Sequence, residues 1–418
     1  MNSKIINFSK LLSANVLAQA VGILIYPILT RLYQPADFTL LNLFLTIANA
    51  ILIVATLDLQ YAIPLPAKDE GAYSLCGATV ITITITMVLT LVGSMFYDSI
   101  GNFFGIKDLG WAIWVLPIYV STMAIGQVVL YVYNREKEFG KIARYQMVQS
   151  LSNSSLKLLL GVFHLGGLAL VDATVIGPII AISSLMIKKI LSIVDGFRTI
   201  PTPDAIVYVK KYRDFPLFSM PKNLICHLSN GLPVLILTPA FGATEVGYFA
   251  LAITIGYLPL SMIASSIYQI MLQDTSDKLN KEVAIFPQIR NFCIYSSIIL
   301  LAICLCFYYI LPSLTGFIFG DNWIKTGEIL TILLPWLATN FLSAALVFIP
   351  ETLLKLKWNL LIETIFIGIR TLVLTIGVTK YDFITTVYLF SAVSFIVKLI
   401  QIIWYCYIAK KHDESLVK

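Results

Sequence analysis

Charged residues are scarce in this sequence. Only 12% of its 418 residues are Asp, Glu, Lys or Arg, whereas 58% are hydrophobic and the mean hydropathy is +0.86. Water-soluble domains carry about 25% charged residues, because their surfaces must interact with water. The composition therefore excludes a soluble globular protein.

Recognisable catalytic and metal-binding motifs are also missing. The sequence contains no glycine-rich phosphate loop, no H-E-x-x-H and no G-x-S-x-G, and its three histidines lie in separate segments. All six cysteines fall inside apolar runs, without the spacing of a zinc site or a disulfide framework. We therefore expect a protein that is not an enzyme and holds no metal and no cofactor.

Apolar stretches long enough to cross about 30 Å of hydrocarbon recur along the whole chain. No small-residue cleavage site precedes Thr30, so the first stretch is expected to remain as a span rather than to be removed as a signal peptide. The pattern predicts an all-α polytopic membrane protein of about twelve transmembrane helices. The predicted spans are 11–30, 39–61, 73–96, 112–133, 147–166, 168–187, 216–240, 247–270, 289–313, 327–350, 359–378 and 383–409.

The positions of the basic residues predict the orientation. With a cytoplasmic N-terminus, 21 of the 29 Lys and Arg residues fall on the cytoplasmic side and only four in outer loops. Basic residues in short loops resist translocation, so both termini are expected in the cytoplasm. The net charge of +6 is then a topology signal, and no nucleic-acid partner is expected.

The longest predicted loop, about 188–215, divides the chain nearly in half. It contains Pro201, Pro203 and a cluster of basic residues, with little apolar periodicity. We predict an N-terminal six-helix lobe at 1–195, a cytoplasmic linker at 196–215 and a C-terminal six-helix lobe at 216–418, around a central polar cavity. Each lobe begins in the cytoplasm, so a duplication would be parallel.

Polar side chains recur at helical spacing within several predicted spans. A polar group in hydrocarbon costs free energy unless it is hydrogen-bonded or hydrated, so such stripes indicate either a cavity or bonding between helices. Both interpretations stay open for the amides. The stripes include Asn15 and Gln19 in the first span, Asn153 and Lys157 in the fifth, and Asn223 and Asn230 in the seventh.

Lys157 is the strongest candidate for a cavity residue, because an isolated ammonium within a span is costly. The alternative is a salt bridge to Asp58 or Glu363 on a neighbouring helix. Glu363 and Arg370 are seven residues apart on one helix face, where the pair could serve structure or a site. Asp58, Asp172 and Glu363 are weak candidates for carboxylates that bind a coupling ion.

Several sequence stretches resemble the O-antigen flippases of the Wzx type, which are polysaccharide transporters related to multidrug and toxin extruders. The likeness covers the whole chain, although Thr39 and Lys222 depart from the family's pattern. The matching stretches are LLSAN (11–15) with Gln19, YPILTRLY (26–33), P-x-D-F (35–38), FPLFSMP (215–221), LPVL (232–235) and F-G-x-x-x-V-G-Y-F (241–249).

The resemblance implies a bacterial inner-membrane flippase that moves undecaprenyl-diphosphate-linked O-antigen repeat units to the periplasmic leaflet, in lipopolysaccharide biosynthesis, by alternating access. It implies contact with membrane lipids, and an O-antigen polymerase and a chain-length regulator are candidate partners. Two alternatives remain: a small-solute or multidrug extruder of the same fold, and a membrane polysaccharide polymerase. In the flippase picture the substrate groove is lined by Asn15, Gln19, Asn153, Lys157, Asn223, Asn230 and Arg370.

Overall fold

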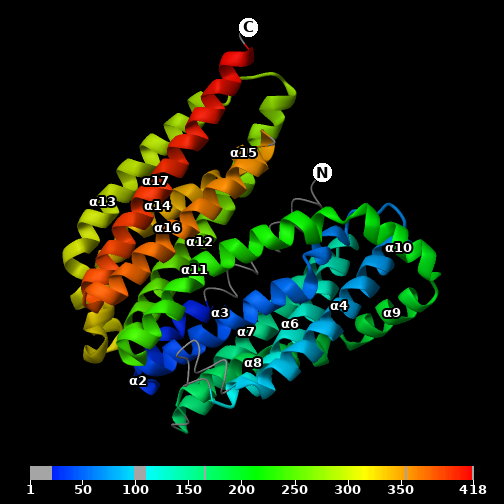
Figure 1. The fold of residues 1–418 in the computed structure, drawn as a ribbon, viewed down its shortest axis with the longest axis horizontal. Helices are drawn as coiled ribbons and strands as arrows, with labels where there is room; N and C mark the ends of the chain where they lie inside the picture. Colours follow the sequence, from blue (N-terminus) through cyan, green and yellow to red (C-terminus); the bar gives the residue numbers. More distant parts are fainter. Residues whose placement is uncertain (1–20, 98–109, 164–165, 354, 417–418) are drawn as a thin grey trace. The chain divides into compact units, whose positions relative to one another are not determined.

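The computed structural model describes residues 21–97, 110–163, 166–353 and 355–416. These ranges form α-helices, short 3-10 and π-helical segments and no β-strand (Figure 1). The all-α architecture predicted from the sequence is confirmed. The elements are α2 (Tyr26–Leu32), α3 (Pro35–Thr56), η1 (Leu59–Ala62), α4 (Asp69–Met95), α6 (Ala112–Arg135), α7 (Phe139–Val162), α8 (Gly167–Leu185), α9 (Ile187–Arg198), α10 (Thr202–Lys211), η3 (Phe215–Ser219), α11 (Met220–Phe241), α12 (Ala243–Asn280), α13 (Phe286–Phe319), η4 (Asp321–Trp323), α14 (Ile324–Leu346), α15 (Phe348–Thr352), α16 (Leu356–Lys380) and α17 (Phe383–Leu416).

Ten helices in the described ranges are long and apolar enough to cross a membrane. They correspond to ten of the twelve predicted spans, so the chain is a polytopic membrane protein. The predicted fifth span is α7, whose 24 residues would extend about 36 Å but include Lys141, Arg144 and Lys157. The first half of the predicted first span lies outside the described residues, and its second half belongs to a short apolar helix, Val21–Leu32.

The chain folds into two compact units, 1–239 and 240–418. The boundary lies near the C-terminal end of α11, so most of this helix belongs to the first unit. The sequence-based division places it in the C-terminal lobe instead. Side-chain contacts explain why α11 groups with the first unit: Nε2 of His227 lies 3.0 Å from the backbone oxygen of Thr46 on α3. The division into two six-helix lobes joined at 196–215 stays a prediction.

Helix α3 has a central place in the first unit, where it packs against α4, α6 and α8. Its first residue is Pro35, whose ring lacks an N–H that the first helical turn would leave unbonded. Asp37 then accepts a 2.8 Å hydrogen bond from the backbone N–H of Gln34. This capping box fixes the start of α3.

The segment predicted to connect the sixth and seventh spans contains two short helices, α9 and α10. Both pack against α4. The approach of α9 is close, because a Cβ atom at Gly77 would lie 2.1 Å from the ring of Phe197. Lys189 on α9 also forms an ion pair with Glu136. The apolar residues of α9 do recur at helical spacing, which was a usable sequence signal, and packing against α4 adds to the stability of both short helices.

The second unit is built around α14, which packs against α12, α13 and α17, while α16 packs against α17 (Figure 1). Aromatic side chains fill the space between these helices. Trp336 on α14 and Phe390 on α17 form an edge-to-face pair with ring centroids 5.3 Å apart. Such pairs bury large apolar areas and fix the angle at which the helices meet.

Candidate functional site

The end of helix α3 has an unusual backbone conformation. Two consecutive non-glycine residues, Leu57 and Asp58, have positive φ angles of 49° and 56°. The left-handed region costs about 1–2 kcal/mol for a residue with a Cβ atom, so surrounding contacts must hold this turn. The turn ends α3 and places the Asp58 carboxylate at the start of η1.

The Asp58 carboxylate is the centre of a polar cluster. Its Oδ2 atom accepts hydrogen bonds from Ser219 Oγ at 2.8 Å and from Asn223 Nδ2 at 2.7 Å. The Lys222 ammonium also attracts the carboxylate. Asp58 is only 2% exposed, so these contacts replace the water that a carboxylate would otherwise bind. They connect the end of α3 to the beginning of α11, 165 residues away in the sequence.

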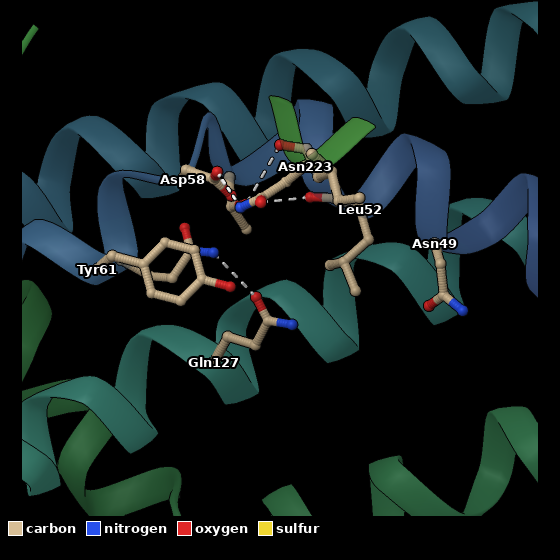
Figure 2. Close-up of a pocket in the computed structure, with 9 residues that line it drawn as sticks. Asn49, Leu52, Asp58, Tyr61, Gln127 and Asn223 are labelled. Atoms are coloured by element: carbon tan, nitrogen blue, oxygen red, sulfur yellow. Dashed lines mark hydrogen bonds between the residues drawn. The ribbon is translucent and has the colours of Figure 1, made fainter. Parts of the chain in front are cut away.

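A cavity of about 330 Å³ lies beside this cluster (Figure 2). Gln60 Nε2 donates a 3.3 Å hydrogen bond to Gln127 Oε1 on α6, which closes one part of the wall. The lining residues that the structure describes include a carboxylate, amides, a threonine and a tyrosine, and none of them is Lys, Arg or His. The lining residues are Asn49, Leu52, Ile53, Thr56, Asp58, Gln60, Tyr61, Gln127 and Asn223.

The sequence identified some of these residues and missed others. Asn223 was predicted as a groove residue and Asp58 as a weak coupling carboxylate, and both line the cavity. Tyr61 and Gln127 were not predicted. Gln127 is an amide within the apolar sequence that becomes α6, and this was the signal that could have identified it.

Lys157 lies on α7 and is half-buried. Its backbone oxygen accepts a 2.8 Å hydrogen bond from the Tyr33 hydroxyl, which holds α7 beside the end of α2. Its Nζ atom forms no salt bridge with any described residue. Asp58 bonds to Ser219 and Asn223, and Glu363 pairs with Lys398, so both carboxylates considered as its partners have other ligands. The role of Lys157 in a groove stays a prediction.

The other predicted groove residues that the structure describes do not line this cavity. Asn153 belongs to the contact between α7 and α8, and its buried Oδ1 atom accepts no hydrogen bond from the described residues. Asn230 is exposed on α11, and Arg370 is buried in the second unit. Asn15 and Gln19 lie outside the described residues.

A second polar cluster couples α16 to α17. Lys398 Nζ lies 3.0 Å from Glu363 Oε1 and 2.8 Å from Gln401 Oε1, and Gln401 Nε2 donates to Glu363 at 2.7 Å. Arg370 acts electrostatically on the same carboxylate. These mutual bonds favour the structural interpretation of Glu363, and its role in ion coupling stays a prediction.

Metal coordination has little support in the part of the chain that the structure describes. No group of three or more His, Cys, Asp or Glu residues there is close enough to hold a metal ion. Asp172 on α8 is half-buried and forms no salt bridge with a described residue.

Comparison with solved structures identifies the fold. The chain superposes on an inward-facing MATE family multidrug transporter of the MOP superfamily with a TM-score of 0.67 and 15% identity, covering 98% of this chain and 99% of that chain. It matches the lipid II flippase MurJ with a TM-score of 0.71 and 11% identity, covering 99% of this chain and 90% of the flippase chain. The chain also superposes on the Vibrio cholerae MATE transporter VcmN, with a TM-score of 0.55 and 16% sequence identity over 98% of each chain.

Sequence comparison identifies the family. No curated protein matches the chain. Residues 28–328 match the model of a family described as polysaccharide biosynthesis protein, which is well over half of the chain. The resemblance to polysaccharide transporters related to multidrug extruders, noted from the sequence stretches, is thereby confirmed. The chain belongs to the polysaccharide biosynthesis protein family and has the fold of the MATE and MurJ transporters.

Proposed function

We propose that this protein moves undecaprenyl-diphosphate-linked O-antigen repeat units from the cytoplasmic to the periplasmic leaflet of the bacterial inner membrane. The observation that supports this most directly is the match of residues 28–328 to a polysaccharide biosynthesis family in a chain with the fold of a lipid II flippase. A family of polysaccharide assembly combined with a transporter fold fits translocation of a lipid-linked saccharide.

The physical problem in this reaction is the transfer of a hydrated headgroup across hydrocarbon. Sugar hydroxyls and a diphosphate lose their hydration at high cost unless protein groups replace the water. The polar cavity beside Asp58 provides such groups within an otherwise apolar bundle. The prenyl chain can remain in the lipid while the headgroup moves through a polar groove by alternating access.

The phenotype of a deletion strain tests this proposal. Loss of the protein should abolish long surface glycan and cause single lipid-linked repeat units to accumulate in the cytoplasmic leaflet. Plasmid-borne wild-type protein should restore the glycan. Normal surface glycan in the deletion strain would show that the proposed function is wrong.

The MATE fold supports a second candidate, export of small solutes or drugs. That activity would change drug resistance while leaving surface glycan and lipid-linked units unchanged. Measurements of drug susceptibility and glycan in the same deletion strain therefore separate the two candidates. A polymerase would instead form sugar–sugar bonds in purified form.

A further inference from the structure

We infer that the cavity beside Asp58 is a carbohydrate subsite that binds one sugar ring of the headgroup through its hydroxyl groups. This inference rests on the proposed function and assigns part of the substrate to a particular place in the first unit. The diphosphate is expected to bind elsewhere, because none of the described residues that line the cavity has a cationic side chain.

The lining has the hydrogen-bonding groups that a sugar requires. A pyranose carries several hydroxyls that each donate and accept, so it needs both kinds of group in a small space. Asp58 supplies acceptors, and Asn49, Gln127 and Asn223 each supply an amide with a donor and an acceptor. Leu52 and Ile53 provide apolar surface for the C–H faces of the ring.

Tyr61 gives this cavity an aromatic wall. Tyr61 is 41% exposed, and the centroid of its ring lies 5.2 Å from that of Tyr131 on α6, with the two rings nearly perpendicular. The contact with Tyr131 holds the Tyr61 ring in one orientation, which lowers the entropy lost when a ligand packs against it. Tyr61 and Gln127 both line the cavity (Figure 2), so one sugar could contact both side chains.

The main groups are already held in place before a ligand enters. Ser219 and Asn223 both bond to Oδ2 of Asp58, and Gln60 bonds to Gln127. Side chains fixed in this way do not need to be ordered on binding, so more of each hydrogen bond contributes to affinity.

The size of the cavity favours a sugar over a bare coupling ion. Its volume of about 330 Å³ would hold about ten water molecules at about 30 Å³ each. A dehydrated cation needs ligands that surround it at about 2.0–2.6 Å, which requires a much smaller space. An ion bound here would keep most of its water and gain little selectivity.

Binding of two kinds of synthetic probe tests the subsite. One set of probes is a polyprenyl diphosphate that carries a single glucose, galactose or N-acetylglucosamine, and the other is the same diphosphate without sugar. With the full chain in lipid nanodiscs, the best sugar-bearing probe should bind about tenfold more tightly than the bare diphosphate, the gain expected for one or two net hydrogen bonds.

The variant Gln127→Leu should reduce this ratio to near one while leaving affinity for the bare diphosphate unchanged. Gln149→Leu is the matched control, because Gln149 contacts Met123 on α6 and does not line the cavity. It should keep the wild-type ratio. Thermal unfolding of both variants confirms that they are folded.

The outcomes separate the subsite from the proposed function. If the wild-type protein binds both kinds of probe equally, or if Gln127→Leu keeps the wild-type ratio of affinities, the assignment of the sugar subsite is wrong. Binding of the lipid diphosphate would still agree with the proposed function. If neither kind of probe binds, both proposals are wrong. If Gln127→Leu instead removes only a dependence of binding on sodium, the cavity is a cation site and the inference is overturned.

Discussion

Lys157 is the residue whose substitution best distinguishes a substrate contact from a structural one. Its ammonium forms no salt bridge with a described residue, and the two carboxylates considered as partners bond to other groups. Lys157→Ala should therefore abolish surface glycan while the amount of protein in the membrane stays near normal. Lys157→Arg should restore part of the glycan, because a positive charge can still bind a phosphate or an acidic sugar.

Quantification of surface glycan and membrane abundance in the same cells checks this prediction. Normal export of glycan by the Lys157→Ala variant would show that Lys157 does not contribute to the groove. Loss of the protein from the membrane would instead indicate a structural ion pair, since removing one partner leaves the other charge unpaired and buried.

At the scale of elements, α16 and α17 depend on the ion pair between Glu363 and Lys398. Both side chains are mostly buried, with exposed fractions of 16% and 10%. Lys398→Met alone should destabilise the protein by about 3–5 kcal/mol, because Glu363 would remain charged and buried. Glu363→Met combined with Lys398→Met should recover most of that loss.

Thermal unfolding in detergent of the wild type, both single variants and the double variant measures the coupling as a double-mutant cycle. Additive losses in the double variant would contradict the prediction. They would show that the two side chains contribute to stability independently.

The contact between α13 and α14 depends on the absence of a side chain at Gly327. A Cβ atom there would lie 2.6 Å from the Cα of Pro312 and 2.8 Å from the backbone oxygen of Leu311, and backbone atoms cannot rotate away. Gly327→Ala should therefore destabilise the second unit by about 1–3 kcal/mol through overpacking.

Gly368 on α16 offers a matched control, because nothing lies within 4 Å of the Cβ position there. Gly368→Ala should be neutral or slightly stabilising, since alanine favours helix more than glycine. The two melting temperatures can be compared directly. Equal melting temperatures would mean that α13 and α14 can move apart with little loss of stability.

At the scale of the whole molecule, the distribution of basic residues predicts the topology. Reporter fusions after Lys68, Arg144, Lys211, Lys281 and Lys357 should report the cytoplasm, because these positions lie in the basic segments. Fusions near Lys107 and Lys380 should report the periplasm. A periplasmic signal at Lys211 would overturn the division into two six-span lobes that both begin in the cytoplasm.

The sequence by itself determined the class of the protein and the places of its helices. Each span depends on the summed hydrophobicity of about twenty consecutive residues, which is a local property and can be read without knowledge of neighbours. Ten of the predicted spans appear as apolar helices, and the family recognised from short stretches is the one that residues 28–328 match. The short helices α9 and α10 were not predicted, although the apolar residues of α9 recur at helical spacing, and both pack against α4.

Only the tertiary structure decided which polar side chains share a site. Helical periodicity places residues on one face of a helix, but it does not say which helix that face meets. Three separate elements supply Asp58, Gln127 and Asn223 to the cavity. The left-handed turn at Leu57 and Asp58, which positions the carboxylate, contains no glycine from which the sequence would have predicted it. The pairing of Lys398 with Glu363 likewise depends on the fold, because the two residues lie on different helices, α17 and α16, that only packing brings together.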